Sequence, residues 1–323
     1  MASQRHIERI AIVGTGTIGA SWAAHYLAHG FDVVATDPGP GAEDALREYV
    51  DRAWETVSAL GLAPGASRDR LSFTDDLQEA AGGADFVQEQ APERLDLKVK
   101  LFADIDAAAP VDAIIASSSS GIPMSDIQTR CEHPERTVIG HPFNPPHVIP
   151  LVEVVGGKAT SAETISAAMA FYAAVGKRPV QLYKELPGHV ANRLQSALYR
   201  EVVYLIAQGV LDVAAADDAV SWGPGLRWGV MGPSLLWHLG GGEGGIQHFM
   251  DTLMDPMANA WKTLGNPQMT PELKQTIVDG VLAEANGHSV DELSAERDAM
   301  LLALQATRAE HELSRPLGSP SAA

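Results

Sequence analysis

The chain has 323 residues, 46% of them hydrophobic, and a formal net charge of −18 at pH 7. This length suffices for two domains that each bury a core, and the composition is that of an ordinary globular protein. The negative charge argues against nucleic acid and anionic membranes as partners, because both are polyanions. It either favours a cationic substrate or only keeps the protein dispersed in water.

Membrane insertion, secretion and metal binding are not predicted. No apolar run reaches the roughly 18–20 residues of a membrane-spanning helix. The first twelve residues lack a charged segment followed by a long apolar stretch, so we expect no secretory signal. The single cysteine, Cys131, cannot build a disulfide framework and has no metal-ligand spacing with its neighbours. We therefore expect a cytoplasmic protein without a metal site.

The first half of the chain alternates short β-branched runs with amphipathic stretches. Helical patterns occupy 42–60, 94–107 and 162–175. The runs typical of strands are, in chain order, 10–13, 32–35, 85–88, 113–115, 137–140, 151–155 and 179–182. Strands that alternate with helices indicate a Rossmann-type α/β fold, a doubly wound parallel sheet covered on both faces.

This pattern breaks at Leu186-Pro187-Gly188. Beyond the break the strand signal fades and long stretches of helical periodicity follow, beginning with 191–207. We predict a first domain over 1–186, an all-α second domain over 187–313 and a flexible tail over 314–323. The helices of the second domain are apolar on more than one face, which suggests burial against another subunit.

A glycine-rich turn, Gly14-Thr15-Gly16-Thr17-Ile18-Gly19, follows the first predicted strand and opens a helix. Gly14 would allow the tight turn, Gly16 the approach of a pyrophosphate, and Gly19 close helix–strand packing. Asp37 ends the second strand, where its carboxylate could bind ribose hydroxyls and would repel a 2′-phosphate. The motif therefore favours NAD over NADP as cofactor. The alternative is a structural βαβ unit that binds no ligand.

A histidine and an amide lie on a proline-rich loop, His141-Pro142-Phe143-Asn144-Pro145-Pro146, and Glu153 follows within the apolar run 151–155. A carboxylate in an apolar strand is costly to bury unless it is paired, and His141 is a plausible partner. Such a pair would raise the basicity of the imidazole and fix its tautomer, as a base that oxidises an alcohol requires. From the residues alone, a solvent-facing Glu153 is an equal alternative.

The loop and its glutamate resemble the 3-hydroxyacyl-CoA dehydrogenase superfamily, whose members carry a similar His-x-x-Asn motif. The resemblance covers nearly the whole chain, and the chain is most similar to the free-acid branch of L-carnitine dehydrogenases and L-gulonate 3-dehydrogenases (the λ-crystallin group). Other stretches that carry the resemblance are Val87-Gln88-Glu89-Gln90-Ala91-Pro92-Glu93, Lys98 with Phe102, the serines 117–120, and Gly188-His189-Val190-Ala191-Asn192-Arg193-Leu194.

The resemblance implies an NAD-dependent dehydrogenase that forms a homodimer through its helical domain. His141 would be the general base and Glu153 its partner, while Ser120 and Asn192 would hold the substrate oxygen. Asn144, Glu93 and Lys98 would lie on the nicotinamide side of the cofactor. From the residues alone, Ser120 is a turn residue and Asn192 a helix cap. Ser118 and Gly121 depart from the asparagine and serine that many relatives have there, which leaves the finer contacts open.

Superfamily members that use CoA thioesters resemble one another in a basic, lysine-bearing helical insertion after the second strand. Here the matching stretch, 41–75, contains no lysine, and acidic residues outnumber its four arginines, Arg47, Arg52, Arg68 and Arg70. Because a CoA 3′-phosphate needs positive charge nearby, we expect a free 3-hydroxy acid as substrate. Surface arginines could still serve a CoA ester.

The second domain concentrates aromatic residues. Four of the six tryptophans fall between 222 and 261. Tryptophan faces bind quaternary ammonium groups and arginine binds carboxylates, and L-carnitine presents both groups. The candidate substrate residues are Arg193, Trp222, Arg227, Trp228 and Trp237. Core or dimer packing is the alternative role for these tryptophans.

We therefore expect oxidation of a small 3-hydroxy acid to its 3-keto acid, with L-carnitine, which would give 3-dehydrocarnitine, as the first candidate. L-Gulonate and a short-chain 3-hydroxyacyl-CoA are the alternative substrates. A non-catalytic NAD-binding protein ranks last, because the set of His141, Glu153, Ser120 and Asn192 is complete.

Overall fold

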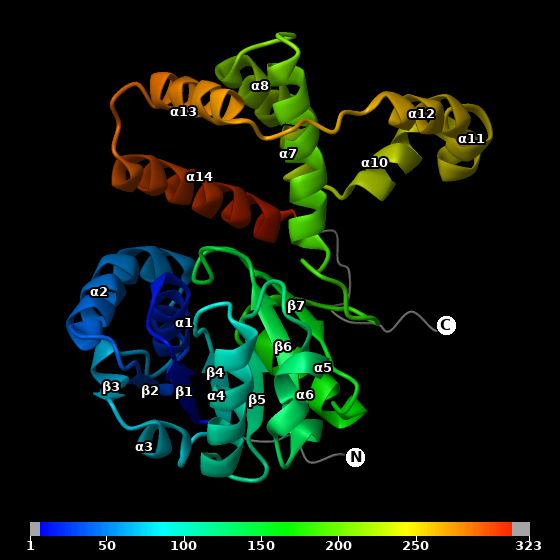
Figure 1. Cartoon of the computed structure of the whole chain (residues 1–323). Coiled ribbons are helices and arrows are strands. Elements are labelled where there is room, and N and C mark those ends of the chain that lie inside the picture. The colour runs from blue at the N-terminus through cyan, green and yellow to red at the C-terminus, as the bar shows by residue number, and fades with distance from the viewer. Residues whose placement is uncertain (1–6, 312–323) are drawn as a thin grey trace. The chain divides into compact units, whose positions relative to one another are not determined.

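The computed structural model describes residues 7–311 and divides the chain into two compact units with a boundary between Asn192 and Arg193. The first unit contains one eight-stranded sheet in the order β3-β2-β1-β4-β5-β6-β7-β8 (Figure 1). Its strands are β1 (Arg9–Val13), β2 (Asp32–Thr36), β3 (Leu71–Thr74), β4 (Phe86–Glu89), β5 (Ile114–Ser117), β6 (Thr137–Pro142), β7 (Leu151–Val155) and β8 (Arg178–Gln181).

Helices cover both faces of this sheet. They are α1 (Thr17–Ala28), α2 (Ala42–Leu60), α3 (Leu77–Ala81), α4 (Leu95–Ala108), α5 (Met124–Ile127) and α6 (Ala162–Ala174), with short 3-10 turns η1 (Arg68–Arg70), η2 (Gln128–Arg130) and η3 (Pro134–Arg136). Because successive strand residues face opposite sides, each face has its own core. Ile10 and Ile12 pack with residues of α1, α2 and α6, whereas Ala11 and Val13 pack with residues of α3, α4 and α5.

The predicted Rossmann-type fold is confirmed, but its last two strands, β7 and β8, run opposite to the predicted parallel arrangement. β7 runs antiparallel to β6, whereas every other neighbouring pair in the sheet is parallel. The connection 143–150 is too short for a parallel crossover, which takes a dozen or more residues. Sequence reasoning also missed β3, because its run Leu-Ser-Phe-Thr is only partly apolar and lies at the edge of the sheet.

The second unit contains only helices in the range that the structure describes. They are α7 (Ala191–Ala207), which begins in the first unit, α8 (Val213–Val220), the π turn η4 (Ser221–Gly225), α9 (Leu226–Trp228), α10 (Pro233–Gly240), η5 (Gly242–Gly244), α11 (Gly245–Thr252), α12 (Met254–Ala260), η6 (Trp261–Thr263), α13 (Pro271–Ala285) and α14 (Val290–Glu310). A small buried cluster joins Val202 and Ile206 of α7 to Val213 and Ala216 of α8. The predicted tail, 314–323, lies outside the described residues.

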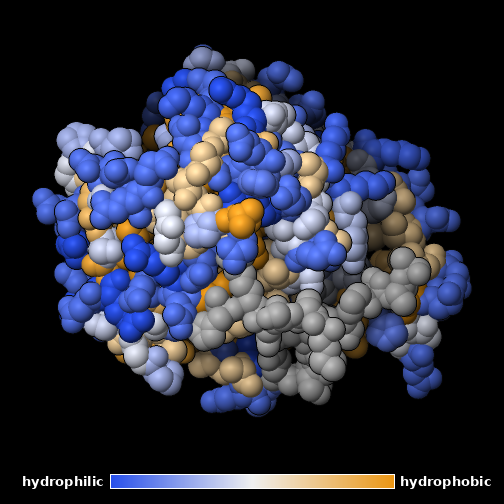
Figure 2. All heavy atoms as spheres, turned by 90° about the horizontal axis from the view of Figure 1, so that it is seen from below, coloured by the Kyte–Doolittle hydropathy of each residue, from blue (hydrophilic) through white to orange (hydrophobic). Residues whose placement is uncertain are grey.

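The face of the molecule in Figure 2 is largely hydrophilic, and hydrophobic side chains are scattered on it among hydrophilic ones. No helix between residues 7 and 311 is long and apolar enough to cross a membrane.

Candidate active site

The residues predicted to act in the first unit gather at one edge of its sheet. The parallel strands β1, β2, β4, β5 and β6 end at this edge. The glycine turn 14–19 follows β1, Asp37 follows β2 and Glu93 lies just beyond β4. The serines 117–120 follow from β5, and His141 lies at the end of β6. In open α/β sheets, ligands bind at the carboxyl ends of the strands.

The glycine turn has the tight geometry that a dinucleotide site requires. Gly14 has a positive φ of 95°, and a Cβ atom at Gly19 would lie 1.9 Å from the carbonyl oxygen of Gly14. At Gly16 a Cβ atom would meet nothing within 4 Å, so the space above the turn is open. No side chain caps the first turn of α1, which begins with Thr17 and Ile18. Its N–H groups therefore remain available to an anion.

Two further side chains fit a dinucleotide at this turn. Asp37 accepts hydrogen bonds from the N–H groups of Thr15 and Gly39, both at 2.8 Å, which holds its carboxylate beside the turn. Gln90 lies behind the turn, and both atoms of its side-chain amide are buried without a hydrogen-bond partner within residues 7–311. Buried amides are normally paired. The uncapped N–H groups at the start of α1 fit the phosphate groups of NAD, and the unpaired amide of Gln90 lies behind the turn that carries them.

A buried ion pair supports the loop that carries Glu93. Lys98 Nζ donates to Glu89 Oε1 at 2.7 Å and to the Ala91 carbonyl oxygen at 2.9 Å, and Ser117 Oγ donates to Glu89 Oε2 at 2.5 Å. The Lys98 side chain is 1% exposed, so its charge lies beneath the loop. A direct contact of Glu93 and Lys98 with the nicotinamide ribose stays a prediction.

Glu93 itself holds the turn after β5. One of its oxygens, Oε1, accepts hydrogen bonds from Ser119 Oγ at 2.7 Å and from the Gly121 N–H at 2.8 Å. Burial opposes ionisation of Glu93, but these bonds and the charge of Lys98 outweigh it and lower the pKa of the carboxyl. Ser118, which like Gly121 differs from the residue that many relatives have at its position, accepts a hydrogen bond from Gln88 Nε2 at 2.9 Å.

His141 and Glu153 face each other directly across the antiparallel pair β6–β7. His141 Nδ1 lies 3.0 Å from Glu153 Oε2, and both side chains are buried. Because the carboxylate can only accept, Nδ1 carries the proton in the neutral ring, which leaves the lone pair on Nε2. The Nε2 atom has no hydrogen-bond partner among the residues that the structure describes. It is therefore free to take a proton from a ligand.

The second oxygen of Glu153 holds the start of α7. Its Oε1 accepts hydrogen bonds from the N–H groups of Val190 at 2.9 Å and Ala191 at 3.0 Å. Burial opposes ionisation, but the bonds from His141, Ala191 and Val190 outweigh it and lower the pKa of Glu153. An ionised carboxylate beside His141 stabilises the imidazolium that forms when the ring takes a proton.

The other predicted residues of the first unit occupy open positions. Ser120 and Asn144 are exposed and Asn192 is half-buried in the first turn of α7. None of the three side chains forms a hydrogen bond within residues 7–311. Their roles in holding substrate and nicotinamide stay predictions.

Three residues at this edge with buried polar atoms received no role from the sequence. Glu89 and Gln90 lie in the stretch 87–93 and His189 lies in the stretch 188–194, both of which carry the resemblance. His189 is buried, and the centre of its ring lies 4.9 Å from that of His141. The available signal was the polar run Gln88-Glu89-Gln90 at the end of a predicted strand, since polar groups in a sheet are costly to bury unless they are paired. No local pattern distinguished His189.

The candidate substrate residues of the second unit are largely exposed. Trp222 is 75% exposed, and Trp228, Trp237 and Arg227 are exposed as well. Trp237 stacks on the buried Phe249 with a ring-centre distance of 4.9 Å. Arg193 lies in the first turns of α7. A role of these residues in substrate binding stays a prediction.

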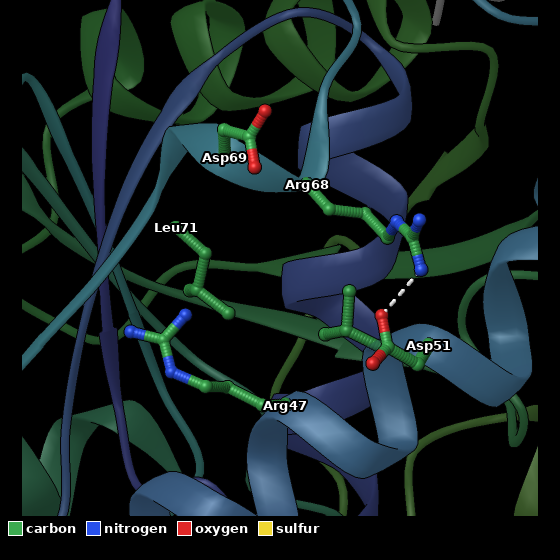
Figure 3. Close-up of a pocket in the computed structure, with 6 residues that line it drawn as sticks. Arg47, Asp51, Arg68, Asp69 and Leu71 are labelled. Atoms are coloured by element: carbon green, nitrogen blue, oxygen red, sulfur yellow. Dashed lines mark hydrogen bonds and ion pairs between the residues drawn. The ribbon is translucent and has the colours of Figure 1, made fainter.

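A cavity of about 440 Å³ lies apart from the predicted site residues, between α2, η1 and the start of β3. Figure 3 shows Arg68 reaching across to Asp51 on α2, with an N–O distance of 2.5 Å. The other arginines of this region are also paired with carboxylates, Arg47 with Glu43, Arg52 with Glu48 and Arg70 with Asp32, at 2.8, 2.6 and 3.1 Å. These partners offset the positive charge that a CoA phosphate would need.

Two family models together span most of the chain. Residues 9–186 match the model described as 3-hydroxyacyl-CoA dehydrogenase, NAD binding domain. Residues 188–281 match the model of the C-terminal domain of the same family. The NAD-binding part thus coincides with the first unit and its glycine turn.

Curated relatives and solved structures are similar over nearly the full length. The L-carnitine dehydrogenase of Streptomyces coelicolor is 49% identical over 298 residues, which cover 92% of this chain and 94% of the relative. The L-carnitine dehydrogenase of a Pseudomonas species is 48% identical over 299 residues, 93% of each chain. The crystal structure of 5-formyl-3-hydroxy-2-methylpyridine 4-carboxylic acid 5-dehydrogenase, an NAD+-dependent dismutase, superposes with a TM-score of 0.80 at 33% identity, covering 94% of this chain and 98% of that one.

Proposed function

The chain belongs to the 3-hydroxyacyl-CoA dehydrogenase family, and we propose that it uses NAD to oxidise the hydroxyl group of L-carnitine to a ketone, giving 3-dehydrocarnitine. The observation that carries the proposal is the buried pair of His141 and Glu153 at the sheet edge where the NAD-binding turn lies. Relatives that are 44–50% identical over most of the chain and are named L-carnitine dehydrogenase support the choice of substrate.

His141 is the base in this reaction. Bound NAD supplies the acceptor for the hydride that leaves the carbinol carbon. His141 Nε2 takes the hydroxyl proton, since Nδ1 is occupied by Glu153. The low pKa of Glu153 keeps its carboxylate charged, so that it offsets the positive charge that His141 acquires. Ser120 and Asn192 hold the substrate oxygen through their unpaired side chains.

A free acid is favoured over a CoA ester by the charges near α2. The four arginines of the stretch 41–75 are each paired with a carboxylate. A CoA phosphate would have to displace these pairs, and the stretch has no lysine to replace them. L-Gulonate needs hydrogen-bond donors rather than an aromatic face, and it remains the second candidate substrate.

The test is NADH formation by the purified chain on a panel of L-carnitine, L-gulonate, L-3-hydroxybutyrate and 3-hydroxybutyryl-CoA. We expect the highest kcat/KM for L-carnitine. A higher kcat/KM for another compound of the panel would identify that compound as the substrate instead of L-carnitine. If none of the compounds is oxidised, the proposal is refuted. In His141→Ala, the loss of a general base should lower kcat by about 10³-fold while NAD affinity is retained.

We further propose that residues 1–186 act as the NAD-binding domain and that residues 187–313 bind substrate and form a homodimer. Large apolar side chains of the second unit support this assembly. Val281 and Leu282 on α13, Val290 and Met300 on α14, and Leu239 on α10 are each at least 47% exposed. A second copy of the chain could cover these exposed apolar side chains. A cytoplasmic location is proposed from the chain's single, unpaired cysteine.

A further inference from the structure

The turn before α7 buries an imidazole beside the pair that carries out proton transfer. His189 is 3% exposed and has a φ of 48°, in the left-handed region that few residues other than glycine adopt. Its Nε2 lies 2.9 Å from the carbonyl oxygen of Ser119. A strained backbone and a buried polar ring are retained only where the surroundings hold them in place.

The contacts of His189 define its tautomer and charge. A carbonyl oxygen can only accept, so Nε2 carries the proton and donates it to Ser119. Nδ1 is buried and has no partner within residues 7–311, so a second proton there would have no acceptor. Burial lowers the pKa of His189; the nearby His141 adds to this effect, while the Ser119 bond, Glu153 and Glu93 oppose it. His189 is therefore a neutral donor near neutral pH.

The bond from His189 fixes the peptide group that leads into Ser120. Ser119 is also held through its side chain, which donates to Glu93 at 2.7 Å, and through its N–H, which donates to Ser117 Oγ at 3.1 Å. The residue next in the chain, Ser120, has an exposed side chain. The backbone that carries the Ser120 side chain is thus held by the contacts of Ser119.

The same turn also contacts the other half of the site. The two residues after His189, Val190 and Ala191, donate their N–H groups to Glu153, which in turn holds His141. The turn 188–191 is therefore a bridge between the serine loop and the His141–Glu153 pair.

We propose that His189 is a positioning residue. Its Nε2–H bond to the Ser119 carbonyl places the Ser120 hydroxyl so that this hydroxyl and His141 contact the same substrate oxygen. This inference rests on the proposed function, because Ser120 and His141 must act on the same hydroxyl group. A small misplacement of such a group has a large effect on rate, because catalysis depends on near-attack geometry.

Two variants separate the hydrogen bond from the volume of the ring. His189→Gln retains an N–H donor that reaches Ser119, whereas His189→Phe fills the space of the ring without a donor. Both place a non-glycine residue at the same positive φ. We expect His189→Phe to lower kcat about tenfold, with the Kd of NAD and the melting temperature little changed, and His189→Gln to retain kcat within about threefold. The reverse order would overturn the proposal.

A double-mutant cycle with Ser120→Ala identifies the residue through which His189 acts. If His189 aligns Ser120, His189→Phe should cost less than about twofold in kcat once the Ser120 hydroxyl has been removed. A full tenfold cost in that background would overturn the proposal. Wild-type turnover reports on the proposed function, while the ratios between variants report on His189, so the two failures are distinguishable.

A measurement without turnover tests the same bond. The ¹⁵N chemical shifts of the His189 imidazole should show the neutral Nε2–H tautomer between about pH 7 and 8. A cationic His189, or an Nδ1–H tautomer, would overturn the proposal even if no substrate of the panel were oxidised.

Discussion

The two units differ in the burial and the pairing of their functional side chains. In the first, charged groups are buried and paired, as Lys98 is with Glu89 and His141 is with Glu153. In the second, the candidate substrate residues are exposed, and Trp222 is 75% exposed. The first unit therefore holds its chemistry in a fixed geometry before any ligand binds, which is how an electrostatic site lowers a barrier.

The second unit lacks a comparable core in the range that the structure describes. Its buried apolar residues are few, namely Val202, Val203, Ile206, Val213, Ala216 and Phe249. A domain of this size normally buries more, so its exposed apolar side chains need another surface to cover them. Substitutions in a buried pair of the first unit should therefore lower kcat. Substitutions on the exposed apolar surface of the second unit should instead affect assembly and stability.

The largest effect on rate within this comparison is expected from Glu153→Gln. The amide can still accept the N–H groups of Val190 and Ala191, but it no longer stabilises a positively charged His141. We expect kcat to fall about 10²-fold while the Kd of NAD changes less than twofold, as measured by steady-state kinetics and by titration. The matched control is Glu43→Gln, which removes an exposed pair with Arg47 and should leave kcat unchanged.

The same variant has a defined pH dependence. The folded-state pKa of Glu153 is lowered, so the stability it contributes is present above its unfolded value of about 4.3 and is lost as the pH falls through the folded value. The difference in melting temperature between wild type and Glu153→Gln should therefore shrink as the pH falls below about 4. A difference that stayed the same between pH 6 and pH 3 would contradict the pairing.

The second unit should respond to a charge placed on its exposed apolar surface. Val278 and Leu282 lie one turn apart on α13 and are 48% and 66% exposed. We expect wild type to have twice the chain mass of 34.2 kDa, and the Val278→Glu, Leu282→Glu double variant to be monomeric with a melting temperature lower by roughly 10 °C. Analytical ultracentrifugation and thermal melting measure both.

A control in the first unit sharpens this comparison. Val111 is 68% exposed, so Val111→Glu adds a charge at a site with an exposure close to the 66% of Leu282. It should change neither mass nor melting temperature. If both variants behave alike, or if wild type sediments with the mass of one chain, the apolar surface of α13 is not an interface.

Local sequence patterns predict several features of the first unit correctly. The helix at 42–60 has the predicted bounds, because Leu46, Val50, Ala53 and Val57 recur at helical spacing and all face the core. Glu153 stands out in its apolar strand, and the register of β6 and β7 brings it opposite His141. Such features depend on neighbours in the sequence or on one adjacent strand.

Other features depend on contacts between distant segments, and no local pattern encodes them. The ring of His189 contacts Ser119, 70 residues earlier in the chain, and Lys177 contacts the loop after β6. The direction of β7 depends on the length of its loop rather than on its apolar residues. In the second unit, periodicity predicted helices but could not predict which apolar faces stay uncovered.

A smaller effect, on cofactor binding, is expected from Gln90→Leu. The amide behind the glycine turn has no partner within residues 7–311, so leucine should raise the melting temperature of the cofactor-free protein and weaken NAD binding about tenfold. Isothermal titration and melting curves measure the two effects. The control is Gln88→Leu, whose amide binds Tyr172, Ser118 and the Gly140 carbonyl, and which should lower the melting temperature instead. Unchanged NAD affinity in Gln90→Leu would exclude Gln90 from the cofactor site.

The smallest effect is expected at Lys177, which differs from the other buried charged residues of the first unit in its partners. Lys177 is buried, and within residues 7–311 it has no carboxylate partner. Its ammonium donates to the carbonyl oxygens of Pro146 and Ile149, in the loop that carries Asn144, and lies 5.2 Å from the centre of the Trp22 ring. Burial lowers the pKa of Lys177 to about 7, and His25 and His29 are the nearby titratable groups.

The sign of the resulting pH dependence follows from proton uptake. Between about pH 7 and 10.5 the unfolded chain binds one more proton at Lys177 than the folded chain, so wild-type stability from this group rises with pH. Lys177→Met removes that dependence. The melting temperature of Lys177→Met relative to wild type should therefore be higher at pH 6 than at pH 9, by a few degrees, whereas the exposed control Lys158→Met should show no such change. An equal difference at both pH values would mean that Lys177 stays charged when buried, and that the carbonyl groups of the loop stabilise it as well as a carboxylate would.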